Sequence, residues 1–143
     1  MEYRPFLRTA QYYETDQMGI VHHSNYIRWL EECRLDWMEQ IGLDYGKMEQ
    51  MGIIVPVLSV SCTYRVVTKF KETVRIVPTL EKLSGVKFAV SYRIENPKTG
   101  ELHNTARTEH CFLDRDFKPL FLKRAFPEIY ETLKQYEGVS MMK

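Results

Sequence analysis

The chain contains 143 residues, of which 44% are hydrophobic and 27% charged, and its 20 Lys and Arg nearly balance 19 Asp and Glu. This composition excludes collagen-like, low-complexity and mostly disordered proteins. The formal charge of +1 provides no global field that would attract a nucleic-acid backbone or an anionic membrane, so we expect neither partner. The length predicts a single domain, residues 1–143, with one hydrophobic core.

The sequence carries neither a signal peptide at its start nor an apolar run long enough to cross a membrane. We therefore expect a cytoplasmic protein. Cys33, Cys62 and Cys111 are an odd number and form no CxxC pair, which predicts reduced core thiols. We expect no metal, because no HExxH motif is present and His103 and His110 fall on opposite faces of a predicted strand.

The first third of the chain predicts a short strand, a bend and a long helix. Residues 6–13 have strand character, and the polar, glycine-containing residues 15–19 end that strand. Over 24–41 the large apolar residues recur every three or four positions, which predicts a helix with one buried face: Tyr26, Leu30, Cys33, Trp37 and Ile41. Ser24 or Asn25 can cap its start.

Four antiparallel strands are predicted after a short helical piece over 44–51. Their ranges are 53–64, 72–82, 86–95 and 102–113, with turn residues between them. In the first of them the even positions are mostly apolar, which predicts a core-facing row: Ile54, Leu58, Val60, Cys62 and Tyr64. A short helix over 127–138 ends the pattern, with Pro127 suited to its first turn.

These elements predict an α+β fold, because the long helix must bury its apolar stripe against the strands that follow it. The expected architecture is a strongly curved antiparallel sheet wrapped around one long central helix, with a short helix near the C-terminus. The other face of the sheet still carries apolar residues, including Val55, Val57 and Val77, and the sheet edges are long. We therefore expect a homo-oligomer.

The segment 12–29 contains the residues best suited to chemistry. Asp16 precedes a bend and two histidines, and a helix begins within about eight residues, so the carboxylate and the helix start must lie close together. Free backbone N–H groups at a helix start can stabilise an oxyanion, and a carboxylate can act as nucleophile or base. Asp16 could instead simply cap the bend as an Asx turn.

The stretch YETDQMGIVHHSNY, residues 13–26, resembles the signature of acyl-CoA thioesterases of the 4-hydroxybenzoyl-CoA thioesterase type, which have the hot-dog fold. The resemblance extends over nearly the whole chain in the order of its elements. It implies that Asp16 is the catalytic carboxylate, that Gly19 forms the bend, and that the N–H of His23 is the oxyanion donor. Glu14 and Thr15 stand where many members carry the first of two aspartates.

By this resemblance we expect hydrolysis of an acyl-CoA thioester without a cofactor, with Asp16 attacking the carbonyl or activating water. The His23 ring could orient water or the carbonyl, or be purely structural. Coenzyme A carries phosphates, so we expect a basic cluster, and Arg65, Lys69 and Lys71 are the best candidates.

The alternative function is an acyl-CoA or acyl-carrier binding module on the same fold without turnover. A hot-dog hydratase is disfavoured because the G-D-x-N-P-x-H loop is missing, and a serine hydrolase because no GxSxG motif is present. The resemblance further implies a homodimer with its helices back to back, or a homotetramer formed from two such dimers.

Overall fold

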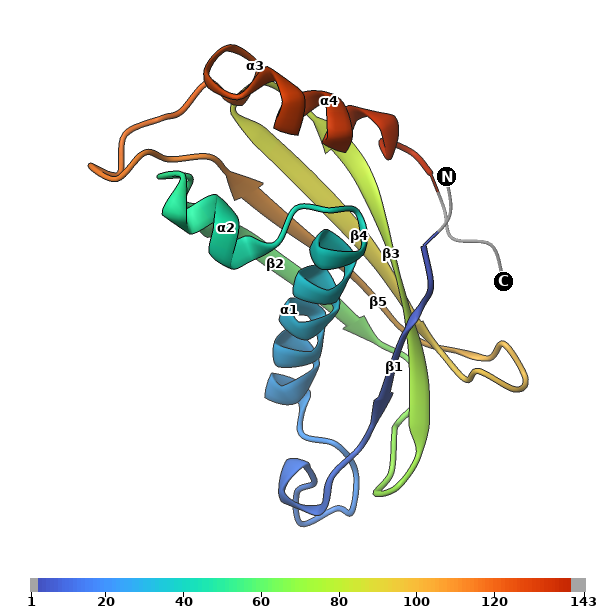
Figure 1. Cartoon of the computed structure of the whole chain (residues 1–143). Coiled ribbons are helices and arrows are strands. Elements are labelled where there is room, and N and C mark those ends of the chain that lie inside the picture. The colour runs from blue at the N-terminus through green and yellow to red at the C-terminus, as the bar shows by residue number, and fades with distance from the viewer. Residues whose placement is uncertain (1–2, 140–143) are drawn as a thin grey trace.

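The computed structural model describes residues 3–139 and shows one curved antiparallel sheet with a long helix against one of its faces (Figure 1). The sheet has five strands in the spatial order β1-β3-β4-β5-β2, so β1 and β2 lie at its two edges. The strand bounds are β1 (Phe6–Thr9), β2 (Val57–Tyr64), β3 (Thr73–Leu83), β4 (Lys87–Glu95) and β5 (Leu102–Cys111). The predicted α+β architecture is confirmed.

The helices are α1 (His23–Gln40), α2 (Tyr45–Gln50), α3 (Leu122–Ala125) and α4 (Pro127–Gln135), and a 3-10 turn, η1, covers Tyr12–Glu14. Gly42, in the left-handed region at φ +86°, follows the end of α1 as a glycine stop. The prediction of Ser24 or Asn25 as the cap is wrong. His22 caps the helix, because its ring accepts a hydrogen bond from the N–H of Ser24.

The core lies between α1 and the sheet. Leu30, Cys33 and Trp37 of α1 are almost completely buried, as their helical spacing predicts, and Trp29, which was not predicted, is buried as well. They belong to one apolar cluster with the inward-facing residues of β3 and β4, including Ile76, Val90 and Ile94. Full burial of one such side chain contributes about 1.5–3 kcal/mol to the free energy of unfolding, so this helix and these strands stabilise each other.

Strand β2 departs from the expected burial pattern. Leu58, Val60 and Tyr64, predicted to face the core, are 50%, 37% and 46% exposed, and only Cys62 among the inward positions of β2 is half-buried. These residues alternate along β2 as predicted and would share one face of the sheet. They are exposed because α1 packs mainly against β3 and β1 and does not cover β2. Because β2 is an edge strand, an apolar row lies uncovered at that edge of the sheet.

A chain of polar side chains crosses the buried layer beneath α1. The guanidinium of Arg34 donates to the hydroxyl of Tyr92 (3.1 Å), Tyr92 is bonded to Thr108 (2.8 Å), and Thr108 is bonded to His110 Nε2 (2.8 Å). Arg34 can only donate, and the order in which each hydroxyl then uses its own proton within the chain is Tyr92 to Thr108 and Thr108 to His110. Burial lowers the pKa of His110 to about 4, so its ring is neutral at pH 7 and carries its proton on Nδ1.

No described helix is long and apolar enough to cross a membrane. Cys33, Cys62 and Cys111 are free, and Cys33 is buried in the core as expected. Within residues 3–139, no group of three or more His, Cys, Asp or Glu side chains could hold a metal ion.

Candidate active site

The bend after η1 is a tight loop whose ends are tied together. Thr15 and Val21 form an antiparallel bridge, and the N–H of Asp16 donates to the carbonyl of Ile20 (2.9 Å). At the tip, the N–H of Gly19 donates to the carbonyl of Asp16 (2.9 Å), and Gly19 has φ +78°. A side chain is strained in this left-handed conformation, so the turn depends on glycine.

The Asx turn considered for Asp16 is present. Its Oδ1 accepts a hydrogen bond from the N–H of Met18 (2.8 Å), which fixes the carboxylate against the loop. None of the described residues donates to Oδ2, and the side chain is half-buried. A cap role and a chemical role are therefore compatible, because one oxygen positions the carboxylate and the other is available.

The first turn of α1 provides a free donor. The His22 cap occupies the N–H of Ser24 through its ring and the N–H of Asn25 through its carbonyl. The N–H of His23 donates to no acceptor in the described part of the chain. The His23 ring is stacked on His22 with centroids 4.2 Å apart.

The loop, the start of α1 and the end of β2 enclose a pocket of about 220 Å³, which we call the loop pocket. Its walls include Asp16, His23, Tyr26, Tyr64 and Arg65. The Tyr64 hydroxyl is 3.4 Å from the His23 carbonyl, to which it donates, and burial raises the pKa of Tyr64 to about 12, so this hydroxyl keeps its proton. The structure thus brings the predicted carboxylate and the predicted helix start to one pocket.

Comparison with known proteins places this chain in a family. Residues 11–133 match the thioesterase-like superfamily. The chain belongs to the thioesterase-like superfamily. It is 36% identical over 130 residues to YneP of Bacillus subtilis strain 168, whose name assigns it provisionally as an acyl-CoA thioesterase, with 88% of this chain and 94% of YneP covered. The prediction of a thioesterase enzyme is confirmed at the level of the family.

A solved structure and a further relative agree. The crystal structure of DHNA-CoA thioesterase from Staphylococcus aureus is 38% identical, superposes with a TM-score of 0.87, and covers 94% of this chain and 91% of its own. A 1,4-dihydroxy-2-naphthoyl-CoA hydrolase of Thermosynechococcus vestitus is 25% identical over 111 residues, 77% of this chain and 75% of that protein. The hot-dog fold is therefore confirmed.

Glu14 connects the loop over residues 15–21 of this thioesterase-family chain to α1. Its carboxylate is 3% exposed and accepts from both Nη atoms of Arg8, from the N–H of Gln11 and from the Trp29 indole, at 2.8–3.0 Å. Its carbonyl accepts from the N–H of His22 and from the Asn25 side chain, each at 2.8 Å. Glu14 therefore holds the loop and is shielded from substrate.

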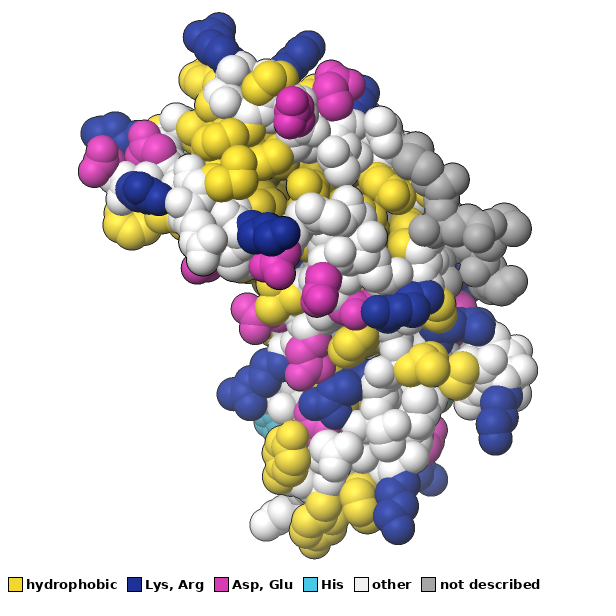
Figure 2. All heavy atoms as spheres, viewed as in Figure 1, with side chains coloured by type: hydrophobic (Ala, Val, Ile, Leu, Met, Phe, Trp, Pro, Cys, Tyr) yellow, Lys and Arg dark blue, Asp and Glu magenta, His cyan; other side chains and the backbone are white. Residues whose placement is uncertain are grey.

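Of the three predicted phosphate ligands, the structure places Arg65 in the wall of the loop pocket. Arg65 lines the pocket, and both Lys69 and Lys71 are exposed in the segment that follows. The backbone of Lys69 bridges to Ile20, which brings this segment against the loop. Lys71 lies over the ring of Phe70, 5.4 Å from its centroid. Figure 2 shows Lys and Arg side chains beside apolar ones at this lower end of the molecule.

Sequence reasoning missed three residues of this region. Tyr64 was expected to face the core, and His22 was not considered as a cap. Glu14 was noted only for standing where many family members carry the first of two aspartates. The residues that could have indicated its role are Arg8, six positions earlier, and Trp29, fifteen positions later. Neither spacing predicts a contact with Glu14 before the fold is known.

Replacing Glu14 should destabilise the fold strongly. We expect Glu14→Gln to lower the free energy of unfolding by about 3 kcal/mol, because half-buried Arg8 then keeps only the exposed carboxylate of Glu32 as an ion-pair partner. The control Glu131→Gln, on the exposed face of α4, should change it by less than about 0.5 kcal/mol. Denaturant unfolding measures both values, and equal values for the two variants would contradict the role of Glu14.

Proposed function

We propose that the protein hydrolyses acyl-CoA thioesters to the free acid and CoA, with the loop pocket as its active site. The observation that carries this proposal is that Asp16, with one carboxylate oxygen not used by the described residues, and His23, with an unused N–H, line the same pocket. Membership of the thioesterase-like superfamily supports the reaction type, and the names of two relatives specify CoA as the carrier.

The N–H of His23 would donate to the thioester carbonyl oxygen, whose negative charge grows as the tetrahedral intermediate forms. Asp16 then acts in one of two ways. In the first, it takes a proton from water as the water oxygen adds to the carbonyl carbon, and returns that proton to the thiolate when the C–S bond breaks. In the second, its Oδ2 attacks the carbonyl, CoA leaves as thiolate, and water hydrolyses the mixed anhydride.

Other residues have supporting roles in this proposal. Gly19 provides the bend that exposes Asp16, and its own N–H is already used by the Asp16 carbonyl. The His23 ring, held by His22 and edge-on to Tyr64, is placed to orient water or the carbonyl. Arg65, Lys69 and Lys71 would bind the CoA phosphates at the rim. The cytoplasmic location stays a prediction from the sequence.

We also propose that two copies associate through β2. This strand has eight residues, has no strand partner on its outer side among the described residues, and exposes Val57, Leu58, Val60 and Tyr64. An apolar strand with a free edge favours pairing with another chain. The expected assembly is a homodimer, or a homotetramer of two such dimers, in which the partner lies next to the loop pocket.

Removing the Asp16 carboxylate should stop turnover while leaving binding intact. We expect Asp16→Asn to lower kcat about 100-fold or more, since the amide can still accept from Met18 but cannot attack or take a proton. CoA release from a panel of acyl-CoAs gives the rate, and calorimetry gives binding. Asp114→Asn is the matched control, because Asp114 also accepts backbone N–H groups but lies in another turn. Retained turnover would refute the proposal, and binding without turnover in the wild type would favour the binding module.

The phosphate-binding role can be tested by comparing two substrates. We expect the combined variant Arg65→Ala, Lys69→Ala, Lys71→Ala to raise KM for acyl-CoA about 10-fold. The variant loses three exposed charge contacts to the phosphates, each of which contributes roughly 0.5 kcal/mol to binding. KM for the matching acyl-pantetheine, which lacks the nucleotide, should stay unchanged. The control is the triple variant Lys118→Ala, Lys123→Ala, Arg124→Ala. These residues lie in or near α3, at the end of the molecule opposite the start of α1 in Figure 1. Equal changes for both substrates would disprove the assignment.

A charge on the inner face of β2 should separate the copies. We expect Val60→Lys to sediment as a monomer at concentrations where the wild type is a dimer or tetramer, because the ammonium group would be buried without a partner. Leu7→Lys is the control, since Leu7 is 57% exposed on β1, the opposite edge strand. If only the β1 variant dissociates, association through β2 is wrong.

A further inference from the structure

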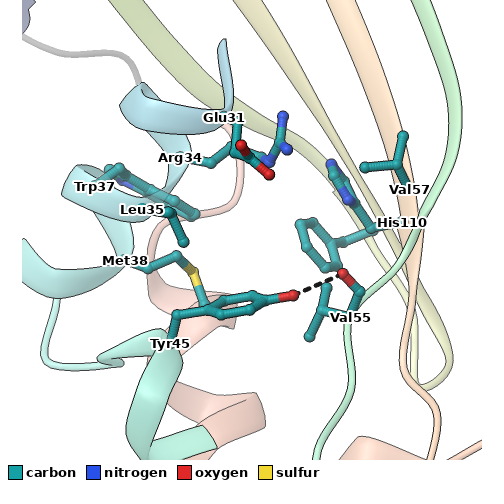
Figure 3. Close-up of a pocket in the computed structure, with 10 residues that line it drawn as sticks. Glu31, Arg34, Leu35, Trp37, Met38, Tyr45, Val55, Val57 and His110 are labelled. Carbon is teal, nitrogen blue, oxygen red and sulfur yellow. Dashed lines mark hydrogen bonds between the residues drawn. The ribbon is translucent and has the colours of Figure 1, made fainter. Parts of the chain in front are cut away.

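A second pocket lies farther along α1, and nothing in the proposed catalytic step uses it. This helix pocket has a volume of about 120 Å³ and is lined by Arg34, Leu35 and Met38 of α1, Tyr45 of α2, Phe88 of β4 and His110 of β5 (Figure 3). A cavity of roughly 150 Å³ accepts a benzene molecule, so the helix pocket has about the size of one six-membered ring.

The walls of the helix pocket are mostly apolar and their polar groups are nearly all satisfied. The Tyr45 hydroxyl donates to the carbonyl of Val55 (2.9 Å), drawn as a dashed line in Figure 3. The neutral His110 ring is stacked on Phe88, 4.6 Å between centroids, and its Nε2 is occupied by Thr108. These groups offer a ligand flat apolar surface and no charge.

One exception is the Trp37 indole N–H, which has no hydrogen-bond partner among the described residues, and the other is Arg34. Its half-buried guanidinium has five N–H donors, and its one hydrogen bond among the described residues goes to the neutral hydroxyl of Tyr92. Glu31 lies beside it at the same end of the pocket in Figure 3, but the two side chains form no ion pair in the described part of the chain. A cation that is partly removed from water and has no carboxylate partner loses hydration free energy. An acceptor oxygen on a ligand can offset that loss by a hydrogen bond.

Both pockets are placed along one helix. His23 and Tyr26 line the loop pocket, and Arg34 lies eight residues beyond Tyr26, about 12 Å along an α-helix at 1.5 Å per residue. Helical side chains lean toward the N-terminus of their helix, which brings the long Arg34 side chain closer to the reacting carbonyl. An acyl group of moderate length that follows α1 from the loop pocket would reach Arg34.

We propose that the helix pocket binds part of the acyl group, and that Arg34 selects acyl groups that carry a hydrogen-bond-accepting oxygen on an apolar body. This inference rests on the proposed function, since it names the substrate class of that reaction. The apolar body packs against Leu35, Met38 and Phe88, while a phenolic, keto or carboxylate oxygen accepts from the guanidinium. The small, apolar interior disfavours the highly hydrated CoA diphosphate as its occupant.

The test compares substrates that differ by one oxygen-bearing group: 4-hydroxybenzoyl-CoA with benzoyl-CoA, and adipoyl-CoA with hexanoyl-CoA. We expect the wild type to favour the oxygenated member of at least one pair by about 10-fold or more in kcat/KM. Arg34→Met, which keeps the apolar stem, should abolish that preference. Arg28→Met, on the exposed face of the same helix, should retain it. No preference in the wild type, or a preference that survives Arg34→Met, overturns the proposal.

Two further measurements separate this proposal from the proposed function. Calorimetry of the same four esters with the Asp16→Asn variant measures the preference as a difference in binding affinity. If the wild type hydrolyses none of them, the proposed function is refuted, and the affinities still test the role of the helix pocket. If Arg34→Met does not fold by thermal melting, Leu35→Trp fills the helix pocket while Arg34 and Tyr92 stay in place. Loss of the preference in Leu35→Trp supports the proposal, and an unchanged preference contradicts it.

Discussion

The buried carboxylate of Glu14 is the interaction on which the candidate site depends. Four donors converge on it from β1, the loop and α1, and its carbonyl accepts two more hydrogen bonds from the first residues around the helix start. A buried carboxylate is tolerated only when it is paired and fully hydrogen-bonded, so these segments must adopt one relative position. That position brings Asp16 and the N–H of His23 to the same pocket.

The structure separates the residues that hold the site from those that face the pocket. Glu14, Arg8 and Trp29 are mostly buried and satisfied by one another, whereas Asp16 and His23 keep one unused group each. The cap is made by His22 and not by His23, which frees the second histidine of the pair. Two adjacent histidines thus have different environments, and this follows from which one precedes the first helical turn.

Local patterns predicted much of this arrangement. The spacing of apolar residues located α1 to within one residue at each end, and the sequence from Asp16 to Gly19 indicated the turn that is present. Contacts between distant segments could not be predicted in this way. The pairing of Glu14 with Arg8 and Trp29 depends on how β1 crosses the helix, and the exposure of β2 depends on which strands the helix covers. The role of Arg34 likewise requires Tyr92 and His110, which reach it from other strands.

The one-way order of donors from Arg34 through Tyr92 and Thr108 to His110 makes the interior sensitive to acid. The unfolded chain protonates this histidine near pH 6.5 and the folded chain only near pH 4, so each step downward between those values favours unfolding. Acid in this range therefore destabilises the fold through a ring that stays neutral in the folded molecule, because only the unfolded chain gains the proton.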